Sequence, residues 1–266
     1  MSTARTLAGF AGALVVVAGW AVAGTAAGRA WASDVSAPLR QAVHAVLALV
    51  GLLLSSALLG TVGLLAAWPL VAAALAAGVA GAVVLRRHRA ERVPPVPEGF
   101  PPQRRDLLLV LGAAAILGVR WGAELLHTLS RGFSHADELH YHLTNSALFV
   151  QSGETWPIRF TSVGDGSAYH PASSELLHAV GLSVLGSDFL SIFLNLGFGA
   201  LALVAGWAIG RHAWNHGAGA LVVAAVLSLP LVVAESGSTL NDTMAIALLL
   251  VAAALLLEAH SAEGST

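Results

Sequence analysis

The chain has 266 residues, of which 56% are hydrophobic and only 11% are charged, and its mean hydropathy is +0.76. Soluble domains carry about 25% charged residues, so this composition excludes both an ordinary soluble globule and an intrinsically disordered chain. The sequence has no Cys, which excludes disulfides, thiolate metal sites and cysteine nucleophiles. Its formal net charge of −2 points to no particular partner, and we expect no nucleic acid among its partners.

Long stretches without Asp, Glu, Lys or Arg indicate membrane-spanning helices, because a crossing needs roughly 20 apolar residues. We predict an all-α fold, a polytopic transmembrane helical bundle with about seven spans. Three crossings are expected in a leader over residues 1–85: one at Leu7–Ala27 and two within Gln41–Leu85, turning near Ala66–Pro69. A cleaved signal peptide is the alternative for Leu7–Ala27, although its apolar run is long for one.

A basic, proline-rich linker over residues 86–105 follows the leader and sets the expected topology. Cytoplasmic loops carry an excess of basic residues, and six Arg flank the stretch VPPVPEGFPP. With this linker in the cytoplasm, the crossing at Leu107–Leu126 runs outward and residues 127–186 are external. The core unit, residues 106–266, then continues with crossings expected over 187–210, 217–234 and 241–258. This topology places the N-terminus outside and the C-terminus in the cytoplasm.

The external segment predicts two helices on the membrane surface rather than a simple loop. Ser134 followed by Asp137 is a helix-start signature of the capping-box kind, and Gly153 can end that helix. The helix is too polar to cross a bilayer, so we expect one face to lie in the headgroups. Its apolar residues recur at helical spacing and are Leu139, Leu143, Ala147 and Val150.

A second surface helix is expected over Ala172–Leu185. Glu175 and His178 are expected nearer its polar side. Its apolar side, by helical spacing, is formed by Leu176, Leu177, Val180 and Val184.

Three acids at the external ends of helices are candidates for chemistry. Asp137 and Glu138 open the first surface helix, and Asp242 opens the last crossing. The structural interpretation is that each acid faces the positive end of a helix dipole. The functional interpretation is a general base above the bilayer, within reach of a lipid-linked substrate. Because the topology brings acids about a hundred residues apart to one face, it favours a shared site, with Glu235 as a weaker member.

The His residues of the external segment have two interpretations. A metal site could combine the acids with His135, His140, His142 and His170. However, His140 and His142 point about 200° apart on a helix. A structural or hydrogen-bonding role is therefore favoured over metal ligation.

Arg120 and Glu124 lie at i,i+4 spacing in or near a crossing. They form either a helix-surface ion pair or a functional site in which Arg120 neutralises a lipid phosphate. Gly217 and Gly219, like the other scattered glycines, are expected to be helix-packing contacts rather than parts of a phosphate-binding loop.

The order and spacing of these features resemble integral-membrane glycosyltransferases with the GT-C fold. The first external loop of that family, where an acidic pair opens an amphipathic surface helix, resembles DELHYHLTNSALFVQSGE. The second surface helix and the returning crossing resemble YHPASSELLHAVGLSVLGSDFLSIFLNLGFG, and the next hairpin resembles LPLVVAESGSTLNDTMAIALLL. The closest patterns are those of protein mannosyltransferases, lipid A aminoarabinose transferases and RgtA/B/C/D-like sugar transferases.

The resemblance implies an enzyme of the bacterial inner (plasma) membrane that acts in glycosylation of the cell envelope. It would transfer a sugar, with inversion, from a polyprenyl-phosphate carrier to a hydroxyl of a lipid or glycan acceptor on the external, periplasmic face. By the same resemblance Asp137 is the general base, Glu138 its acidic neighbour and Asp242 the second acid. The residues expected around the substrates are Tyr169, His170, His140, Arg120, Arg131 and Arg159. The resemblance implies no certain cofactor and is compatible with a divalent cation.

The resemblance covers about Leu107–Ala259, whereas the family runs several hundred residues further. We therefore expect this chain to match an N-terminal portion, from a truncated or a split enzyme. The leader has no counterpart in the family pattern. One alternative is a transporter or an ion- or metal-binding membrane protein, although the crossings after Glu124 carry almost no charge. The other is a non-catalytic subunit that scaffolds a second membrane chain.

Overall fold

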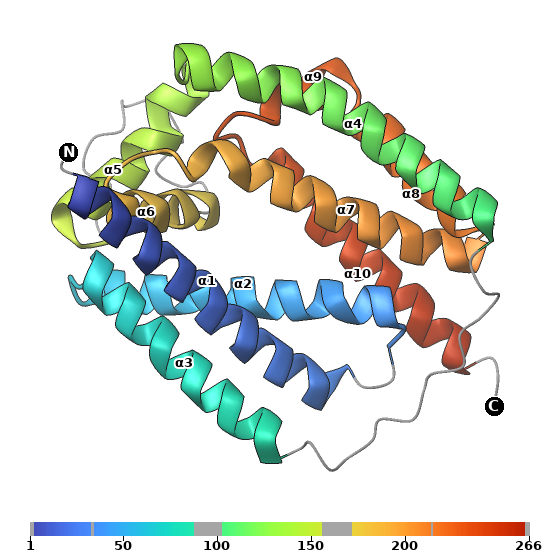
Figure 1. Ribbon diagram of the computed structural model, residues 1–266, viewed down its shortest axis with the longest axis horizontal. Coiled ribbons are helices and arrows are strands. Elements are labelled where there is room, and N and C mark those ends of the chain that lie inside the picture. Colours follow the sequence, from blue (N-terminus) through green and yellow to red (C-terminus); the bar gives the residue numbers. More distant parts are fainter. Residues whose placement is uncertain (1–2, 33–34, 88–102, 156–171, 214, 264–266) are drawn as a thin grey trace.

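The computed structural model describes residues 3–32, 35–87, 103–155, 172–213 and 215–263, and within these ranges it has helices and no strand. Six helices of the described ranges are long and apolar enough to cross a membrane, which confirms the expected all-α membrane protein. They pack side by side as a bundle (Figure 1). These six are α1 (Thr3–Trp31), α2 (Ala37–Thr61), α3 (Ala67–Arg87), α4 (Arg104–Arg131), α7 (Ser191–Ala213) and α10 (Asp242–Glu263).

The helix boundaries follow from glycines that adopt a conformation closed to most side chains. Gly153 ends α5 (Leu143–Ser152) with φ 74°, and Gly186 ends α6 (Ser173–Leu185) with φ 67°. Glycine lacks a Cβ and tolerates this left-handed backbone, so it commonly terminates helices. Both stops agree with the sequence expectations, and the expected turn near Ala66–Pro69 is found just before it, at residues 62–66 between α2 and α3.

The sixth of the seven expected crossings, expected as one continuous helix over 217–234, is instead two helices. The first is α8 (His216–Leu227), of 12 residues, and the second is α9 (Pro230–Glu235), of six. Pro230 has no N–H to donate and stands at the start of α9, where that loss costs nothing. The indole N–H of Trp121 donates to the carbonyl oxygen of Leu227 over 3.0 Å, which satisfies one acceptor freed by the break.

Close approaches between helices occur at glycines, as expected from the sequence. A Cβ on Gly217 would lie 2.6 Å from the carbonyl oxygen of Asp106, where α8 meets α4. A Cβ on Gly19 would overlap the carbonyl of Ala74, where α1 meets α3. The leader also packs on the rest of the bundle, since α1 contacts α6, and α2 contacts α6, α7 and α10.

The ends of the helices gather at two ends of the bundle with opposite charge (Figure 1). At the arginine end, α1, α3, α7 and α10 finish and α2, α4 and α8 begin; it carries Arg29, Arg40, Arg86, Arg87, Arg104, Arg105 and Arg211. At the acidic end, α2 and α4 finish, α7 and α10 begin, and the short helices other than α8 are found. It carries seven acids, Asp137, Glu138, Glu154, Glu175, Asp188, Glu235 and Asp242, against the two arginines Arg5 and Arg131. This separation agrees with the alternation of crossings expected from the sequence.

Glu258 ties three chain segments together at the arginine end. Its Oε1 accepts a hydrogen bond from the backbone N–H of Ser36 over 3.0 Å and lies 3.6 Å from Nη1 of Arg211. Its Oε2 lies 3.0 Å from Nε2 of His212. The link between α1 and α2 is thereby fastened to the ends of α7 and α10.

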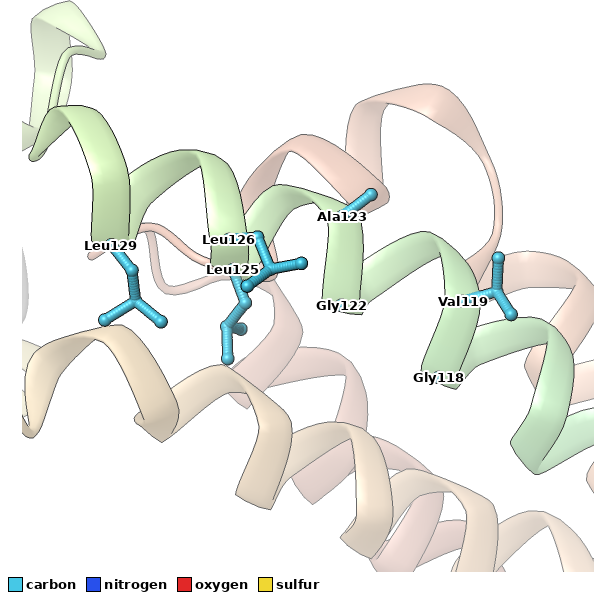
Figure 2. Close-up of a pocket in the computed structure, with 7 residues that line it drawn as sticks. All are labelled: Gly118, Val119, Gly122, Ala123, Leu125, Leu126 and Leu129. Carbon is cyan, nitrogen blue, oxygen red and sulfur yellow. The ribbon is translucent and has the colours of Figure 1, made fainter.

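An open apolar groove of about 460 Å³ runs along α4 (Figure 2). Glycines help to shape it, because a Cβ on Gly118 or Gly122 would meet nothing within 4 Å. A surface of this kind on a membrane-spanning helix is suited to contact with hydrocarbon chains. Its lining residues are Gly118, Val119, Gly122, Ala123, Leu125, Leu126 and Leu129.

Candidate functional site

Asp137 and Glu138 are neighbours in sequence but occupy opposite environments. Glu138 is 4% exposed, and its Oε2 accepts hydrogen bonds from the backbone N–H groups of His135 (2.7 Å) and Ser134 (3.0 Å). Asp137 is exposed. The acid that closes the start of this helix is therefore Glu138, and the expected pairing of Ser134 with Asp137 is corrected. The carboxylate of Asp137 faces solvent and makes no hydrogen bond that caps the start of the helix.

The turn that carries Glu138 is the π-helix η2 (Glu138–His142), which holds one residue more than an α-turn. Its signature is the hydrogen bond from the N–H of Leu143 to the carbonyl oxygen of Glu138, five residues earlier. Single π-turns of this kind are frequent at functional sites. The face of η2 and α5 that points into the bundle consists of Glu138, His142, Asn145, Ser146 and Phe149.

The inward face of this first helix is mainly polar and includes the buried Phe149, whereas its outer face is mixed, since His140 and Thr144 are exposed beside Leu139. Leu139 is 55% exposed, and Leu143, Ala147 and Val150 are half-buried. Val150 packs against the buried cluster that includes Phe149, and the position of this helix in the headgroup region stays a prediction. The same arrangement places His140 on the exposed side and His142 inside, which agrees with the expected divergence of the two rings.

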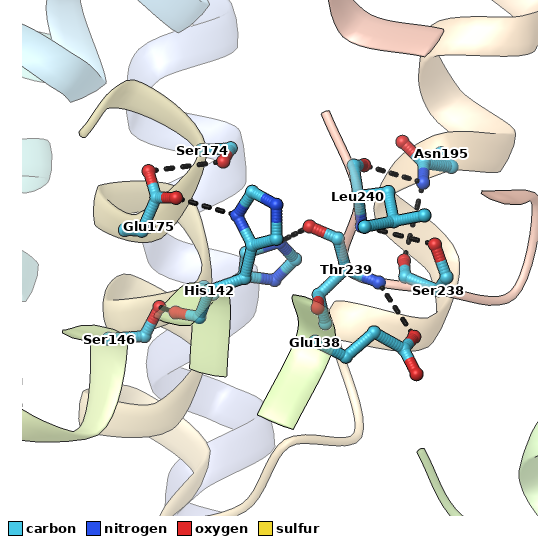
Figure 3. A network of polar contacts seen from close by, with 10 residues as sticks. Glu138, His142, Ser146, Ser174, Glu175, Asn195, Ser238, Thr239 and Leu240 are labelled. Carbon is cyan, nitrogen blue, oxygen red and sulfur yellow. Dashed lines mark hydrogen bonds and ion pairs between the residues drawn. The ribbon is translucent and has the colours of Figure 1, made fainter. Parts of the chain in front are cut away.

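The acidic end brings together segments about a hundred residues apart. Oε1 of Glu138 accepts a hydrogen bond from the backbone N–H of Thr239 over 3.1 Å, across a separation of 101 residues. Thr239 belongs to the turn between α9 and α10, three residues before Asp242. Asp242 is exposed and opens α10. The helix start that bears Asp137 and the helix start that bears Asp242 are therefore joined by one buried hydrogen bond (Figure 3).

Glu235, the weaker candidate from the sequence, is buried beside Asp242. Its Oε2 accepts from the backbone N–H and from the hydroxyl of Thr243, both over 3.1 Å. Burial, together with the neighbouring Asp242 carboxyl group, raises the pKa of Glu235 to about 7. Glu235 therefore holds its proton well above the pH at which an exposed glutamate is ionised.

Helix α6 supplies a second buried polar group, contrary to expectation. Glu175 and His178 were expected on its exposed side, but they are 2% and 3% exposed, because α1, α2, α3, α5 and α7 cover the helix. Glu175 Oε1 lies 2.6 Å from Nδ1 of His142 (Figure 3). Burial lowers the pKa of His178 to about 4, so its ring is neutral near neutral pH.

The remaining predicted residues are dispersed or lie elsewhere. Arg131 is exposed at the last position of α4, at the acidic end, whereas Arg120 is exposed eleven residues earlier on the same helix. No ion pair joins Arg120 to Glu124, both of which lie in the described part of the chain. Arg159, Tyr169 and His170 fall outside the described residues.

Metal ligation finds no support in the side chains that can be located. Within the described ranges, no group of three or more His, Cys, Asp or Glu side chains is arranged to hold a metal ion. The helical spacing of His140 and His142 predicts that they do not share a metal, and the structure places His140 on the exposed side and His142 in the interior. A divalent cation stays a prediction of the family resemblance.

Several buried residues of this site were not selected from the sequence as candidates. They are Glu175, His178, Asn195, Ser238 and Thr239, and together with Glu138 and His142 they form the polar interior of the acidic end. A usable signal existed: Glu138 and His142 are four residues apart, Glu175 and His178 are three apart, and both spacings put the pair on one helix face. In a membrane protein, a polar stripe on an otherwise apolar helix points inward.

Comparison with known proteins returned no match, whether against family models, curated proteins or solved structures. The resemblance to GT-C glycosyltransferases therefore rests on the sequence patterns alone.

Proposed function

We propose that this chain is the membrane-embedded unit of a glycosyltransferase that takes its sugar from a polyprenyl-phosphate carrier. The observation that supports this proposal is the buried Glu138–Thr239 hydrogen bond, which holds the segments bearing the exposed acids Asp137 and Asp242 at one end of the bundle. Water-facing carboxylates at the end of an apolar bundle are accessible both to a lipid-anchored donor and to a polar acceptor. The proposal includes a bacterial plasma membrane, with the acidic end on its external face.

In the proposed step Asp137 acts as the general base. Its carboxylate accepts the proton of an acceptor hydroxyl while that oxygen forms a bond to the anomeric carbon of the sugar. The bond from the anomeric carbon to the phosphate oxygen breaks at the same time, and the polyprenyl phosphate leaves with the electron pair. Attack opposite to the leaving group inverts the anomeric carbon. A positioned base of this kind contributes about 10²- to 10⁴-fold to the rate.

The other residues have supporting roles in this proposal. Glu138 spends both carboxylate oxygens on backbone N–H groups, so it orients the turn that carries Asp137 rather than moving a proton. Arg131 is better placed than Arg120 to stabilise the leaving phosphate, because it lies about 16 Å further along α4 toward the acidic end. Asp242 would position the acceptor.

The test is a transfer assay in membrane vesicles that contain the full chain, supplied with a panel of radiolabelled polyprenyl-phosphate sugars. We expect label to pass to an acceptor fraction, and Asp137→Asn to reduce this transfer at least a hundredfold with unchanged protein in the membrane. Asp188→Asn is the matched control, because Asp188 is another exposed acid of the acidic end, outside the proposed site. Full transfer by Asp137→Asn would remove Asp137 from the base role.

The rival functions give different results in the same vesicles. A transporter would show uptake of protons or of a divalent metal ion that depends on Asp137, Glu138 and His140, without sugar transfer. A scaffold subunit would copurify with a second membrane chain and transfer sugar only in its presence. Either outcome, obtained without transfer by the chain itself, would replace the glycosyltransferase proposal for this polypeptide.

A further inference from the structure

The turn between α9 and α10 is buried although it joins two helices at an end of the bundle. Ser236 and Thr239 are fully buried, and Ser238 is 5% exposed. A buried turn needs partners for its backbone groups, because an unpaired N–H or C=O away from water costs free energy. The partners here come from three other elements of the bundle.

Two side chains hold the backbone of Thr239 from its two polar groups. Its N–H donates to Oε1 of Glu138 over 3.1 Å, and its carbonyl oxygen lies 3.3 Å from Nε2 of His178. Because a carbonyl only accepts, Nε2 of His178 carries the hydrogen, and the neutral ring leaves Nδ1 as an acceptor. That Nδ1 is buried and has no hydrogen-bond partner in the ranges that the structure describes.

A third side chain gathers the carbonyl groups of the same turn. The amide Nδ2 of Asn195, on α7, lies 2.7 Å from the carbonyl oxygen of Glu235. It also lies 3.0 Å from that of Leu240 and 3.3 Å from that of Ser238 (Figure 3), so its two hydrogens are shared among three acceptors. Asn195 is itself buried. Polar side chains of η2, α6 and α7 thus hold the turn.

We propose that Glu138, His178 and Asn195 are positioning residues that hold the 235–240 turn in one register against η2 and so fix Asp242 relative to Asp137. This inference rests on the proposed function for its catalytic meaning, but its geometric content can be measured without any substrate. Displacements of about 1 Å in a reacting site can cost a hundredfold in rate. The hydrogen bond that Nε2 of His178 donates is the contact of this ring with the turn.

The absence of native Cys allows a direct measurement of this register. Spin labels on Ser134→Cys and Asn241→Cys, in the full chain in lipid nanodiscs, report the distance between the two helix starts. We expect one narrow distance distribution in the parent protein. His178→Leu and Glu138→Gln should each broaden it, whereas His178→Gln should restore it, because a Gln side chain can donate an N–H to the carbonyl of Thr239.

Ser146→Ala is the matched control, since Ser146 is buried in the same polar layer but bonds only to the backbone of its own helix. It should leave the distribution narrow. Distributions that stay narrow in both His178→Leu and Glu138→Gln would overturn the positioning role. If His178→Leu fails to fold, Glu138→Gln and Asn195→Leu decide the matter in the same way.

The transfer assay separates this inference from the proposed function. In the vesicles, His178→Leu should lower kcat tenfold to a hundredfold with KM within twofold, and His178→Gln should recover most of the loss. A broadened distance in variants of a parent protein that transfers no sugar would retain the positioning geometry and reject the proposed function, whereas transfer that survives Asp137→Asn would only remove Asp137 from the base role. An essential Asp137 with an unchanged distance in every variant would reject the positioning role alone.

Discussion

The arginine end and the acidic end of the bundle use their charged groups in different ways. At the arginine end, one carboxylate, that of Glu258, gathers Ser36, Arg211 and His212 and closes a junction between three segments. At the acidic end, Glu138 is held chiefly by backbone N–H groups, and exposed carboxylates remain beside it.

This difference shows which end of the bundle has exposed carboxylates beside a buried polar network. Arg residues outnumber acidic residues at the arginine end, as expected for a face that the positive-inside tendency assigns to the cytoplasm. At the acidic end, buried acids and His residues build a rigid polar interior, and Asp137 and Asp242 stand at its border with water. A site for chemistry requires such a supported border, since groups held by a rigid interior keep their geometry.

The arginine end and the acidic end differ in function only if they face opposite sides of the membrane. Single cysteines at Ser134 and Asn241 should react with an impermeant maleimide in intact cells, whereas Arg87→Cys should react only after lysis. Ser238 is unsuitable as a labelling site because its side chain is buried. Labelling of Ser134→Cys and Asn241→Cys from opposite sides would mean that Asp137 and Asp242 cannot share a site.

The helix packing between the two ends can be tested by adding one methyl group. A Cβ on Gly217 would approach the carbonyl oxygen and Cα of Asp106 to 2.6 and 2.7 Å, so Gly217→Ala should destabilise the bundle by about 1–3 kcal/mol. Gly112→Ala is the matched change on α4, where the new Cβ meets nothing within 4 Å. Thermal unfolding in detergent should separate the two variants, and equal midpoints would contradict this account of the α4–α8 contact.

The junction at the arginine end should matter for stability and not for activity. Glu258→Ala leaves the N–H of Ser36 and the side chain of His212 without their acceptor, with an expected cost of about 1–2 kcal/mol for a partly buried group. Sugar transfer measured below the unfolding temperature should be unchanged. Glu258→Gln, which keeps one acceptor, should be intermediate. A selective loss of transfer in Glu258→Ala would show that the arginine end takes part in the chemistry.

The smallest expected effect is a pH dependence at the acidic end. The pKa of Glu235 is about 7 in the folded chain and ordinarily 4.5, so its contribution to stability is present below pH 4.5 and is lost as the pH rises through 7. The pKa of His178 is lowered from 6.5 to about 4, so its contribution is present above pH 6.5 and is lost as the pH falls through 4. The two oppose each other between these limits.

Glu235→Gln isolates one side of this balance. In the parent, the loss from Glu235 offsets the gain from His178 as the pH rises from 4.5 to 6.5, so we expect the unfolding midpoint of the variant to rise with pH over this range more steeply than that of the parent. Midpoints measured across this range for parent and variant provide the test. Parallel pH profiles for the two proteins would show that Glu235 does not carry the neutral-pH proton.

The sequence was informative where local chemistry decides the structure. Charge-free runs located the crossings, and Gly153 and Gly186 end helices because only glycine adopts their backbone angles at little cost. The break between α8 and α9 was missed, because apolar residues continue through it and hide the effect of Pro230. The apolar composition of a segment shows whether it suits a lipid environment. Whether the helix continues depends on single backbone groups, such as the N–H that Pro230 lacks.

The candidate site was less predictable, because burial depends on packing between distant segments. Two adjacent acids look alike in the sequence, yet Glu138 is buried and Asp137 is exposed. Glu175 and His178 were assigned to a water-facing side by a pattern that holds for soluble proteins. Where lipid covers much of the outside, the protein interior is the favourable place for polar side chains, so the same pattern has the opposite meaning.

The π-turn of η2 has a consequence for sequence change in this chain. Its extra residue sets which of the two adjacent acids points inward, since each residue added or removed rotates the preceding segment by about 100°. Deletion of Leu139 would leave Asp137, in place of Glu138, four positions before His142. The loss of this one residue would thereby exchange the positions of the two acids. The shorter Asp137 side chain would point into the bundle, and the longer Glu138 side chain would turn away from it. A change of length at this turn is therefore far more disruptive than a change of residue type at Leu139, whose side chain points outward.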